Sequence, residues 1–358
     1  MSLLGRRIAR LIEREGPLPL AQFMAIALHD PEHGYYATRE PLGAAGDFTT
    51  SPEISQIFGE LLGLWCAQAW LDQGKPKAAH LVELGPGRGT LLADALRAAR
   101  IVPEFLASVE ILLVEMSPGL QAAQQALLQD AGVPIHWVRR WDEVPKDRPL
   151  FLLANEFLDA LPICQFVKTE RGWCERMVLA GGSGQLVSAL SPLPTPIDVP
   201  AQRGMPPLGA VYEISPAATA LVEDVSRTIA QHSGAALFID YGYAAGGFGD
   251  TLQAVRQQSF ADVFSAPGES DLSAHVDFAT MLHSAESGGS AAYGPIDQGD
   301  LLRSLGIESR ATALSQRQPH DADAIATAVD RLTSPAQMGT LFKAFAIAPK
   351  HGPKPPGF

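Results

Sequence analysis

Cysteine is nearly absent from the sequence. Its 358 residues include only Cys66, Cys164 and Cys174, an odd number at spacings that do not match those of metal ligands. These counts exclude a disulfide framework and a cysteine-based zinc site. They favour reduced thiols in a cytoplasm.

Basic residues are also scarce. Lys and Arg number 27 against 39 Asp and Glu, which gives a net charge of −12. A protein that binds the phosphate backbone of a nucleic acid needs clustered basic side chains. We therefore expect no nucleic-acid partner and a preference for a positively charged substrate.

Long apolar runs are missing as well. No stretch is long enough to cross a bilayer, so we expect no membrane insertion. Residues 1–16 place Leu4, Ile8, Leu11 and Ile12 at helical spacing and contain acids. This pattern indicates a docked amphipathic helix rather than a transit peptide, and we expect a bacterial cytoplasmic protein.

One histidine pair has the spacing of a zinc-binding helix. His29 and His33 are four residues apart, but Pro31 and Gly34 would break the helix that such a site needs. We therefore expect no metal ion.

What the sequence does contain is a glycine-rich turn between an apolar strand and a helix. The stretch LVELGPGRGT at 81–90 has its strand at 81–84, and the helix starts near Thr90. Glycine has no Cβ, so such a turn lets the backbone approach a ligand and aims the N–H groups of a helix start at it. The turn glycines are Gly85, Gly87 and Gly89.

Two acids stand at the ends of neighbouring strands. Glu83 precedes the turn, and Glu115 closes a second apolar strand at 111–115, followed by Met116. Ligands of doubly wound sheets bind outside the carboxyl ends of the strands, so both carboxylates would face one crevice. Glu115 suits a ribose diol and Glu83 an amino-acid ammonium, which resembles the cofactor site of class I S-adenosylmethionine-dependent methyltransferases. An ordinary α/β turn with two solvated acids is the alternative.

Apolar strands separated by helices indicate a doubly wound, Rossmann-like parallel sheet. We expect an N-terminal helical region with a cofactor lid at 1–78, a core at 79–162 and 208–358, and an inserted β-rich substrate-recognition subdomain at 163–207. The segment 340–349 would add a last, antiparallel strand. The expected parallel strands are 81–84, 111–115, 135–138, 150–154 and 235–240, with helices at 90–100 and 118–128.

A polar loop at 39–51 precedes a helix. Ser51 as N-cap and Pro52 at the first helical position predict one helix that continues to Trp65. The loop residues from Asp47 to Ser51, with Thr49 among them, would fold over the cofactor and aim hydroxyls at its carboxylate. A capped helix behind a surface loop is the alternative.

Further polar residues follow the later strands. Asp142 would accept a hydrogen bond from an adenine amino group, and Trp141 would cover the ring, although both could be surface residues. The fourth strand runs into Asn155 and Glu156, with Asp159 three positions on. Catalytic and binding groups of such sheets collect at this place.

These pieces together resemble the MidA-like methyltransferases, a family linked to the assembly of respiratory complex I. The resemblance implies a class I methyltransferase fold, S-adenosylmethionine as methyl donor, and an arginine of an NADH dehydrogenase subunit as acceptor. The oligomeric state stays open, with a homodimer as one option. The matching pieces are GDFTTSPEISQIFGELLGLW (46–65), VELGPGRGTL (82–91), NEFLDALP (155–162), IDYGY (239–243), and DTLQAVR with PGESDLSAHVDF (250–278).

An arginine acceptor needs carboxylates near the point of transfer, because its guanidinium stays charged and offers donors but no lone pair. We assign Glu156 and Asp159 to this role, with Asp240 and Glu213 behind them and His275 as a base. Each could instead be a helix cap or a surface residue, which is the preferred interpretation for Glu213 and His275. The competing functions are a non-catalytic, cofactor-binding assembly chaperone and a nicotinamide-dependent oxidoreductase.

Overall fold

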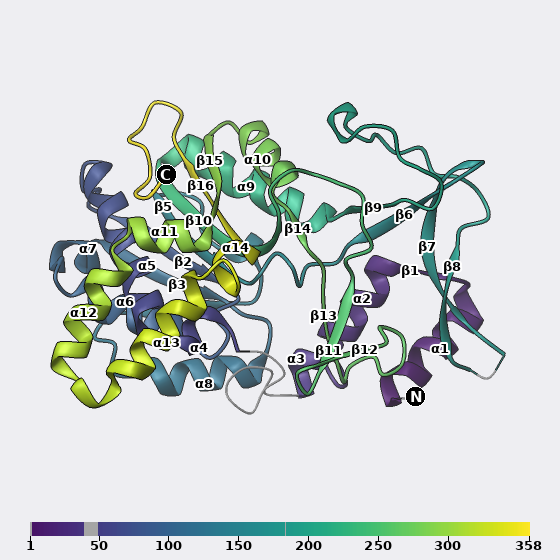
Figure 1. Ribbon diagram of the computed structural model, residues 1–358, viewed down its shortest axis with the longest axis horizontal. Helices are drawn as coiled ribbons and strands as arrows, with labels where there is room; N and C mark the ends of the chain where they lie inside the picture. Colours follow the sequence, from purple (N-terminus) through teal and green to yellow (C-terminus); the bar gives the residue numbers. More distant parts are fainter. Residues whose placement is uncertain (1, 39–48, 183) are drawn as a thin grey trace. The chain divides into compact units, whose positions relative to one another are not determined.

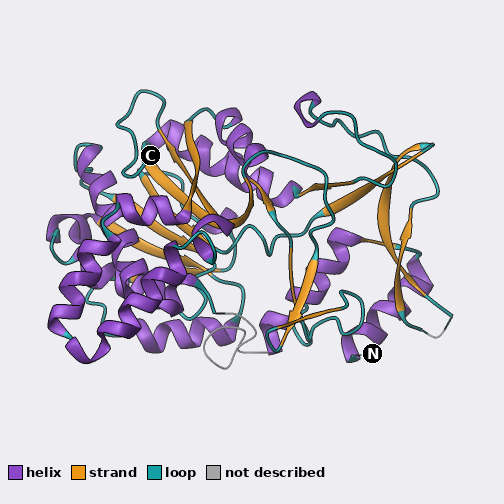
Figure 2. Ribbon diagram, viewed as in Figure 1, coloured by secondary structure: helices purple, strands orange, loops and turns teal. Residues whose placement is uncertain are grey.

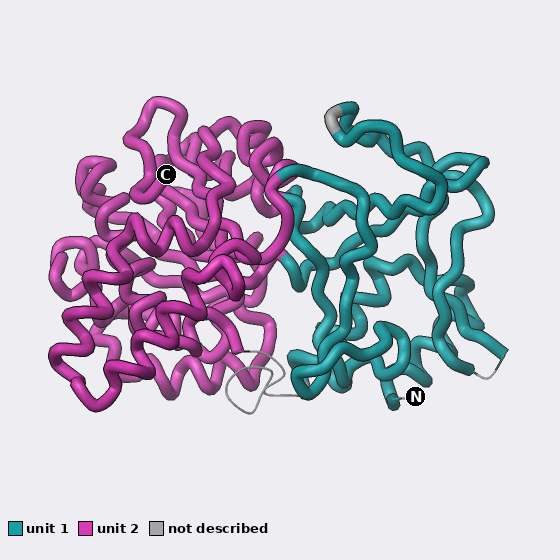
Figure 3. The backbone as a smooth tube through the Cα atoms, viewed as in Figure 1, with its two compact units in different colours: residues 1–48, 159–219, 245–277 teal, residues 49–158, 220–244, 278–358 magenta. Residues whose placement is uncertain are grey.

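The chain divides into two compact units in the computed structural model, which describes residues 2–38, 49–182 and 184–358 (Figure 3). Unit 1 comprises residues 1–48, 159–219 and 245–277. Unit 2 comprises residues 49–158, 220–244 and 278–358. Each unit is therefore assembled from three separate stretches of sequence.

Unit 2 is built on a mixed sheet with the strand order β4-β3-β2-β5-β10-β16-β15 (Figure 1). Every neighbouring pair from β4 to β10 is parallel, whereas β16 runs antiparallel to both β10 and β15. All six residues of β2 are buried, as expected for the centre of a sheet that is covered on both faces. The strands are β2 (Ala79–Leu84), β3 (Val109–Val114), β4 (Ile135–Val138), β5 (Leu150–Asn155), β10 (Gly234–Tyr243), β15 (Ala291–Asp297) and β16 (Phe342–Ala348).

Helices cover the two faces of this sheet (Figure 2). One core cluster joins the apolar sides of α5 and α6 to alternate residues of the strands, among them Leu81, Ile111 and Phe151. The helices of unit 2 are α4 (Ser51–Ile54), α5 (Gln56–Asp72), α6 (Thr90–Ala99), α7 (Pro103–Ser108), α8 (Pro118–Leu128), α10 (Phe278–Ser287), α11 (Gln298–Ser304), α12 (Ile307–Arg317), α13 (Ala322–Thr333) and α14 (Met338–Leu341), with most of α9 (Pro216–His232) and the 3-10 turns η1 (Trp141–Glu143) and η3 (Pro319–Asp321).

The parallel ladders continue one residue past the strands. The backbone N–H of Gly85 donates to Val114 O (3.1 Å), that of Glu115 to Val138 O (2.9 Å), and that of Glu156 to Ile239 O (2.9 Å). The carboxyl ends of neighbouring strands are therefore in register, and the residues that follow them lie along one edge of the sheet.

Unit 1 combines N-terminal helices with short antiparallel strands. One sheet has the order β1-β7-β6-β9 with β8 paired to β7, and a second has the order β12-β11-β13. Its elements are α1 (Leu3–Glu15), β1 (Leu18–Pro19), α2 (Leu20–His29), α3 (Tyr35–Thr38), β6 (Cys164–Thr169), β7 (Gly172–Ala180), β8 (Leu186–Leu190), η2 (Ala201–Arg203), β9 (Val211–Ile214), β11 (Gln253–Arg256), β12 (Ser259–Ala261), β13 (Asp271–Ser273) and β14 (Val276–Asp277).

The strand and helix pattern of the core confirms the sequence-based prediction. Each of the five expected parallel strands is present, and the segment at 340–349 forms β16, which is antiparallel to β10 as expected. The strand β15 and the helices α9 and α11 to α13 have no counterpart in the prediction. None of the helices in the described part of the chain combines the length and the apolar character that crossing a bilayer takes.

The single helix predicted from Ser51 onward is wrong. The structure forms α4 and α5, separated by Ser55, whose backbone is extended (φ −155°, ψ 133°). The Ser55 hydroxyl accepts from the N–H of Ile57 at 3.3 Å and so caps α5, whereas Ser51 is already the first residue of α4 and its side chain caps nothing.

The compact units also divide the chain differently from the expected domains. Residues 1–38 do not form a region of their own, because apolar side chains of α1 and α2 such as Leu4 and Phe23 are buried with Val178 of β7 and Leu272 of β13. Burial thus groups the N-terminal helices with the inserted strands and with residues 245–277.

The close approach of α5 and α6 gives a first test. A Cβ at Gly63 would lie 2.4 Å from Ala95 O, so Gly63→Ala should push α6 away and lower the free energy of unfolding by about 1–3 kcal/mol. Gly119→Ala is the matched control, since its Cβ would meet only Ser117 Oγ, at 3.8 Å. Urea unfolding followed by circular dichroism measures both. Equal stability of the two variants would contradict the packing argument.

Candidate cofactor site

The glycine turn between β2 and α6 adopts a backbone that favours glycine. Gly85, Gly87 and Gly89 have φ values of 60°, 53° and 87°, a region that other residues rarely enter. A Cβ at Gly85 would lie 2.6 Å from the ring of Phe157, so a side chain at this position would also collide. Glycine is therefore required at Gly85, both by its backbone conformation and by the lack of room for a side chain.

Glu83 is buried near the tip of β2. It is 5% exposed, and its Oε2 atom has no hydrogen-bond partner among the described residues. Burial, and after it the charge of Glu115, raise the pKa of Glu83 to about 8. The two carboxyl groups therefore lie near enough to interact.

Glu115 follows β3 and is better supplied with donors. Its Oε1 accepts from the backbone N–H of Ser117 (2.8 Å), and its Oε2 accepts from Gln124 Nε2 (3.2 Å). Burial raises the pKa of Glu115 to about 7, although both hydrogen bonds oppose the rise. Met116, the next residue, is 43% exposed.

Two buried oxygens are suited to a ligand that donates hydrogen bonds. Within the described part of the chain, Glu83 Oε2 and Asn155 Oδ1 are buried without a partner. Orphaned buried acceptors are rare in folded proteins because each carries an uncompensated desolvation cost. An ammonium and hydroxyl groups, which S-adenosylmethionine carries, are the donors that such oxygens lack.

The short helix α4 makes hydrogen bonds to Glu156 after β5 and to the start of α6. The backbone N–H of Ser51 donates to Glu156 Oε1 (2.8 Å), and Glu53 Oε1 accepts from the hydroxyl of Thr90 at the start of α6 (2.6 Å). The hydroxyl of Ser51 donates to Gln298 Oε1 (3.5 Å). Of the expected lid, Thr49 to Ser51 are described, whereas Asp47 and Phe48 lie outside the described residues.

Glu156 is held in a conformation that its residue type rarely adopts. Its φ is 51°, and its Oε1 accepts from Asn155 Nδ2 (3.0 Å) as well as from Ser51. Burial raises the pKa of its carboxyl, against the opposing hydrogen bonds. Strain of this kind persists only where the surroundings determine it, and it is frequent at functional sites.

Asp240 braces the loop that follows Glu156. It is 1% exposed at β10, and its Oδ2 accepts from the backbone N–H groups of Phe157 (3.1 Å) and Leu158 (2.8 Å). Its Oδ1 accepts from the N–H of Tyr241 (2.9 Å). These hydrogen bonds give Asp240 a supporting part, although the sequence grouped it with the catalytic candidates.

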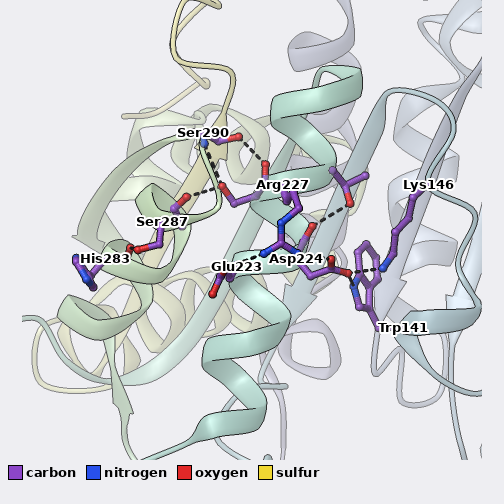
Figure 4. A network of polar contacts seen from close by, with 11 residues as sticks. Trp141, Lys146, Glu223, Asp224, Arg227, His283, Ser287 and Ser290 are labelled. Atoms are coloured by element: carbon purple, nitrogen blue, oxygen red, sulfur yellow. Dashed lines mark hydrogen bonds and ion pairs between the residues drawn. The ribbon is translucent and has the colours of Figure 1, made fainter. Parts of the chain in front are cut away.

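The two candidate adenine-binding residues after β4, Trp141 and Asp142, bond to other side chains of the protein. Asp142 forms a two-point ion pair with Arg140 (2.9 and 3.0 Å) and is largely exposed. The indole Nε1 of Trp141 donates to Asp224 Oδ2 on α9 (2.7 Å), which also pairs with Lys146 (Figure 4). Both side chains expected near an adenine thus have contacts of their own.

The other two catalytic candidates belong to unit 1. Asp159 accepts through its backbone carbonyl from Ala274 N (3.0 Å). The backbone N–H of His275 donates to Thr251 Oγ1 (2.9 Å), and burial lowers the pKa of its imidazole. A neutral imidazole at neutral pH could accept a proton.

The interpretation of Glu213 as a surface acid is wrong. It is 7% exposed on β9, where Oε2 accepts from the hydroxyl of Thr251 (2.5 Å) and Oε1 accepts from Gln165 Nε2 (2.5 Å) and Thr251 N (2.9 Å). A polar network inside unit 1 holds it, and Thr251 links it to His275.

Sequence reasoning missed Gln124 and Glu53. Gln124 occupies the apolar stripe of α8 between Leu120 and Leu128, at four-residue spacing, and is fully buried. A polar residue in such a stripe was the available signal. Glu53 had no comparable signal, because its partner Thr90 is brought to it only by the fold. Among the described residues, no group of His, Cys, Asp and Glu is arranged to hold a metal ion.

A mixed sheet with this strand order and a parallel centre, a left-handed glycine turn and two acids at adjacent strand tips define a class I S-adenosylmethionine-dependent methyltransferase fold. Residues 61–296 match the family described as "Putative S-adenosyl-L-methionine-dependent methyltransferase".

Relatives and a solved structure agree with this class. Over 96% of this chain, the protein arginine methyltransferase NDUFAF7, mitochondrial, is 37% identical in Mus musculus and 38% in Homo sapiens, covering 84% and 83% of those proteins. A crystal structure from Burkholderia thailandensis, bound to S-adenosyl-homocysteine, superposes with a TM-score of 0.87 and 28% identity over 99% of this chain and 94% of that one.

The chain belongs to this family of S-adenosylmethionine-dependent methyltransferases. The predicted fold, enzyme class and methyl donor are confirmed, and the nicotinamide interpretation is set aside.

The raised pKa values of Glu83 and Glu115 predict pH-dependent cofactor binding. An uncharged Glu83 must lose its proton to bind an ammonium, so the affinity for S-adenosylhomocysteine should rise as the pH increases from about 6 to about 8. Calorimetry in buffers of different ionisation enthalpy should show proton release. Glu83→Gln should lose most of this dependence, and an affinity independent of pH in the native protein would contradict the assignment.

Proposed function

We propose that this protein methylates an arginine side chain of another protein. The observation that carries the proposal is the 37% identity, along 96% of the chain, to a relative named as a protein arginine methyltransferase. To carry out this reaction, the protein needs a site for the methyl donor, a site for the guanidinium group and a group that accepts a proton.

Unit 2 contains residues suited to the donor. S-adenosylmethionine, when bound, supplies an electrophilic methyl group on its sulfonium. Glu83 would accept from the ammonium of its amino-acid end, Glu115 would accept from its ribose hydroxyls, and Asn155 Oδ1 would take a further donor. The left-handed glycine turn leaves room for the backbone to approach it.

We assign Glu156 as the residue that accepts the proton released by the arginine. An arginine must lose a proton when its nitrogen gains a methyl group, and a carboxylate with a raised pKa is a better proton acceptor than an exposed one. Burial raises the pKa of Glu156, and the hydrogen bonds from Ser51 and Asn155 fix its orientation. The planar guanidinium would present two N–H groups to this carboxylate.

The remaining candidates extend the proposal. Asp159 and His275, both in unit 1, stay proposals as a carboxylate for an arginine and as a base, and burial lowers the pKa of His275. Asp142, Met116 and the hydroxyls of Thr49 and Ser51 stay proposals as cofactor contacts.

For the acceptor protein we propose a subunit of the respiratory NADH dehydrogenase, as the family resemblance implies. We place the enzyme in a bacterial cytoplasm, which suits its three free cysteines.

The function is tested by mass spectrometry of methylarginine. Native protein with isotopically labelled S-adenosylmethionine and NADH dehydrogenase subunits should label an arginine. Glu156→Gln keeps the shape of the side chain but lowers its basicity, so kcat should fall about 100-fold or more while S-adenosylhomocysteine affinity changes little. Glu104→Gln, an exposed acid on α7, is the matched control and should leave the rate unchanged.

Two results would count against the proposal. If the label appeared on residues other than arginine, the protein would still be a methyltransferase, but the proposal that arginine is the acceptor would be wrong. Full activity of Glu156→Gln would remove Glu156 as the proton acceptor.

A further inference from the structure

Gln124 is a buried amide that the proposed chemistry does not use. It lies on α8, is fully buried, and makes three hydrogen bonds with three different elements. Its Nε2 donates to Gly87 O in the glycine turn (2.7 Å) and to Glu115 Oε2 after β3 (3.2 Å). Its Oε1 accepts from the indole Nε1 of Trp137 on β4 (2.8 Å).

The orientation of this amide is determined by its partners. Trp137 has only a donor to offer, whereas Gly87 O and the ionised carboxylate of Glu115 offer only acceptors. A flipped amide would place its oxygen against a carbonyl and a carboxylate and its N–H groups against the indole. The hydrogen bonds therefore permit one orientation, in which the amide nitrogen faces Gly87 O and the Glu115 carboxylate.

The two oxygens that accept hydrogen bonds from Gln124 belong to two parts of the candidate cofactor site. Gly87 is the middle glycine of the turn, and Glu115 is the acid suited to the ribose. Gln124 bonds to both of them. The neighbouring Gln121 also reaches Glu115, but it bonds to the backbone carbonyl (2.6 Å) and leaves the carboxylate alone.

We propose that Gln124 is a positioning residue for cofactor binding, which locks the glycine turn to the Glu115 carboxylate and keeps that carboxylate able to accept from a ribose. A hydrogen bond to the charged form of an acid favours that form, so the amide acts on the charge of Glu115 as well as on its place. The opposing influence is burial, which raises the pKa of Glu115. The inference rests on cofactor binding and is independent of the methyl acceptor.

Gln124→Leu tests the role because leucine fills similar space without a donor. The Glu115 carboxyl should titrate at higher pH in the cofactor-free variant, measured by NMR of 13C-labelled carboxyl groups, because the charged form loses a donor. The affinity for S-adenosylhomocysteine at pH 7, measured by calorimetry, should fall about tenfold or more, and its rise with pH should move to higher pH. Gln121→Leu is the matched control on the same helix. It should leave the titration of Glu115 in place and change the affinity by less than about twofold.

The outcomes separate positioning from simple helix packing. A merely structural glutamine would change the melting temperature in Gln124→Leu but leave the titration of Glu115 in place, which would overturn the proposal. Equal shifts in Gln121→Leu would overturn it as well. If Gln124→Leu does not fold, Gln124→Met and Trp137→Phe carry the same test, since the first removes the donors and the second frees the amide to rotate. Native affinity and native titration in these variants would refute the role.

Discussion

Two buried carboxyl groups at adjacent strand tips are the constraint on which the rest of the site depends. Glu83 and Glu115 are removed from water, and none of the ion pairs recorded for the described residues includes either of them. Burial therefore raises their pKa values to about 8 and about 7. The core that the central strands share with α5 and α6 offsets this cost, so the site keeps acceptors ready for a ligand with an ammonium and hydroxyls.

The surroundings of these acids are held by single polar contacts from distant parts of the sequence. Gln124 joins the glycine turn to Glu115, α4 joins the start of α6 to Glu156, and Asp240 holds the loop after Glu156. Each contact satisfies a backbone or carboxylate group that burial would otherwise leave unpaired. The same contacts keep a strained backbone at Glu156, which a flexible loop would release.

Membership of the family and the geometry of unit 2 support each other without repeating the same information. The family match gives the methyl donor, and the register of the parallel strands explains why Glu83 and Glu115 lie at adjacent strand tips. Unit 1 adds a buried network around Glu213 and Thr251 that links two segments far apart in the chain. Residues 250–277, which are part of the stretch that carries the family resemblance, belong to this unit.

The sequence by itself determined the core strands, the glycine turn and the two strand-end acids, because apolar periodicity and glycine spacing are local and the chain order of a doubly wound sheet places strand ends together. The break at Ser55, the burial of Glu213, the division into units and the bridge made by Gln124 were decided only in the tertiary structure. Each of these depends on a partner more than a few residues away or on competition between local caps. Local pattern carries no information on which distant donor will reach a buried acceptor, and that pairing is settled when the helices pack.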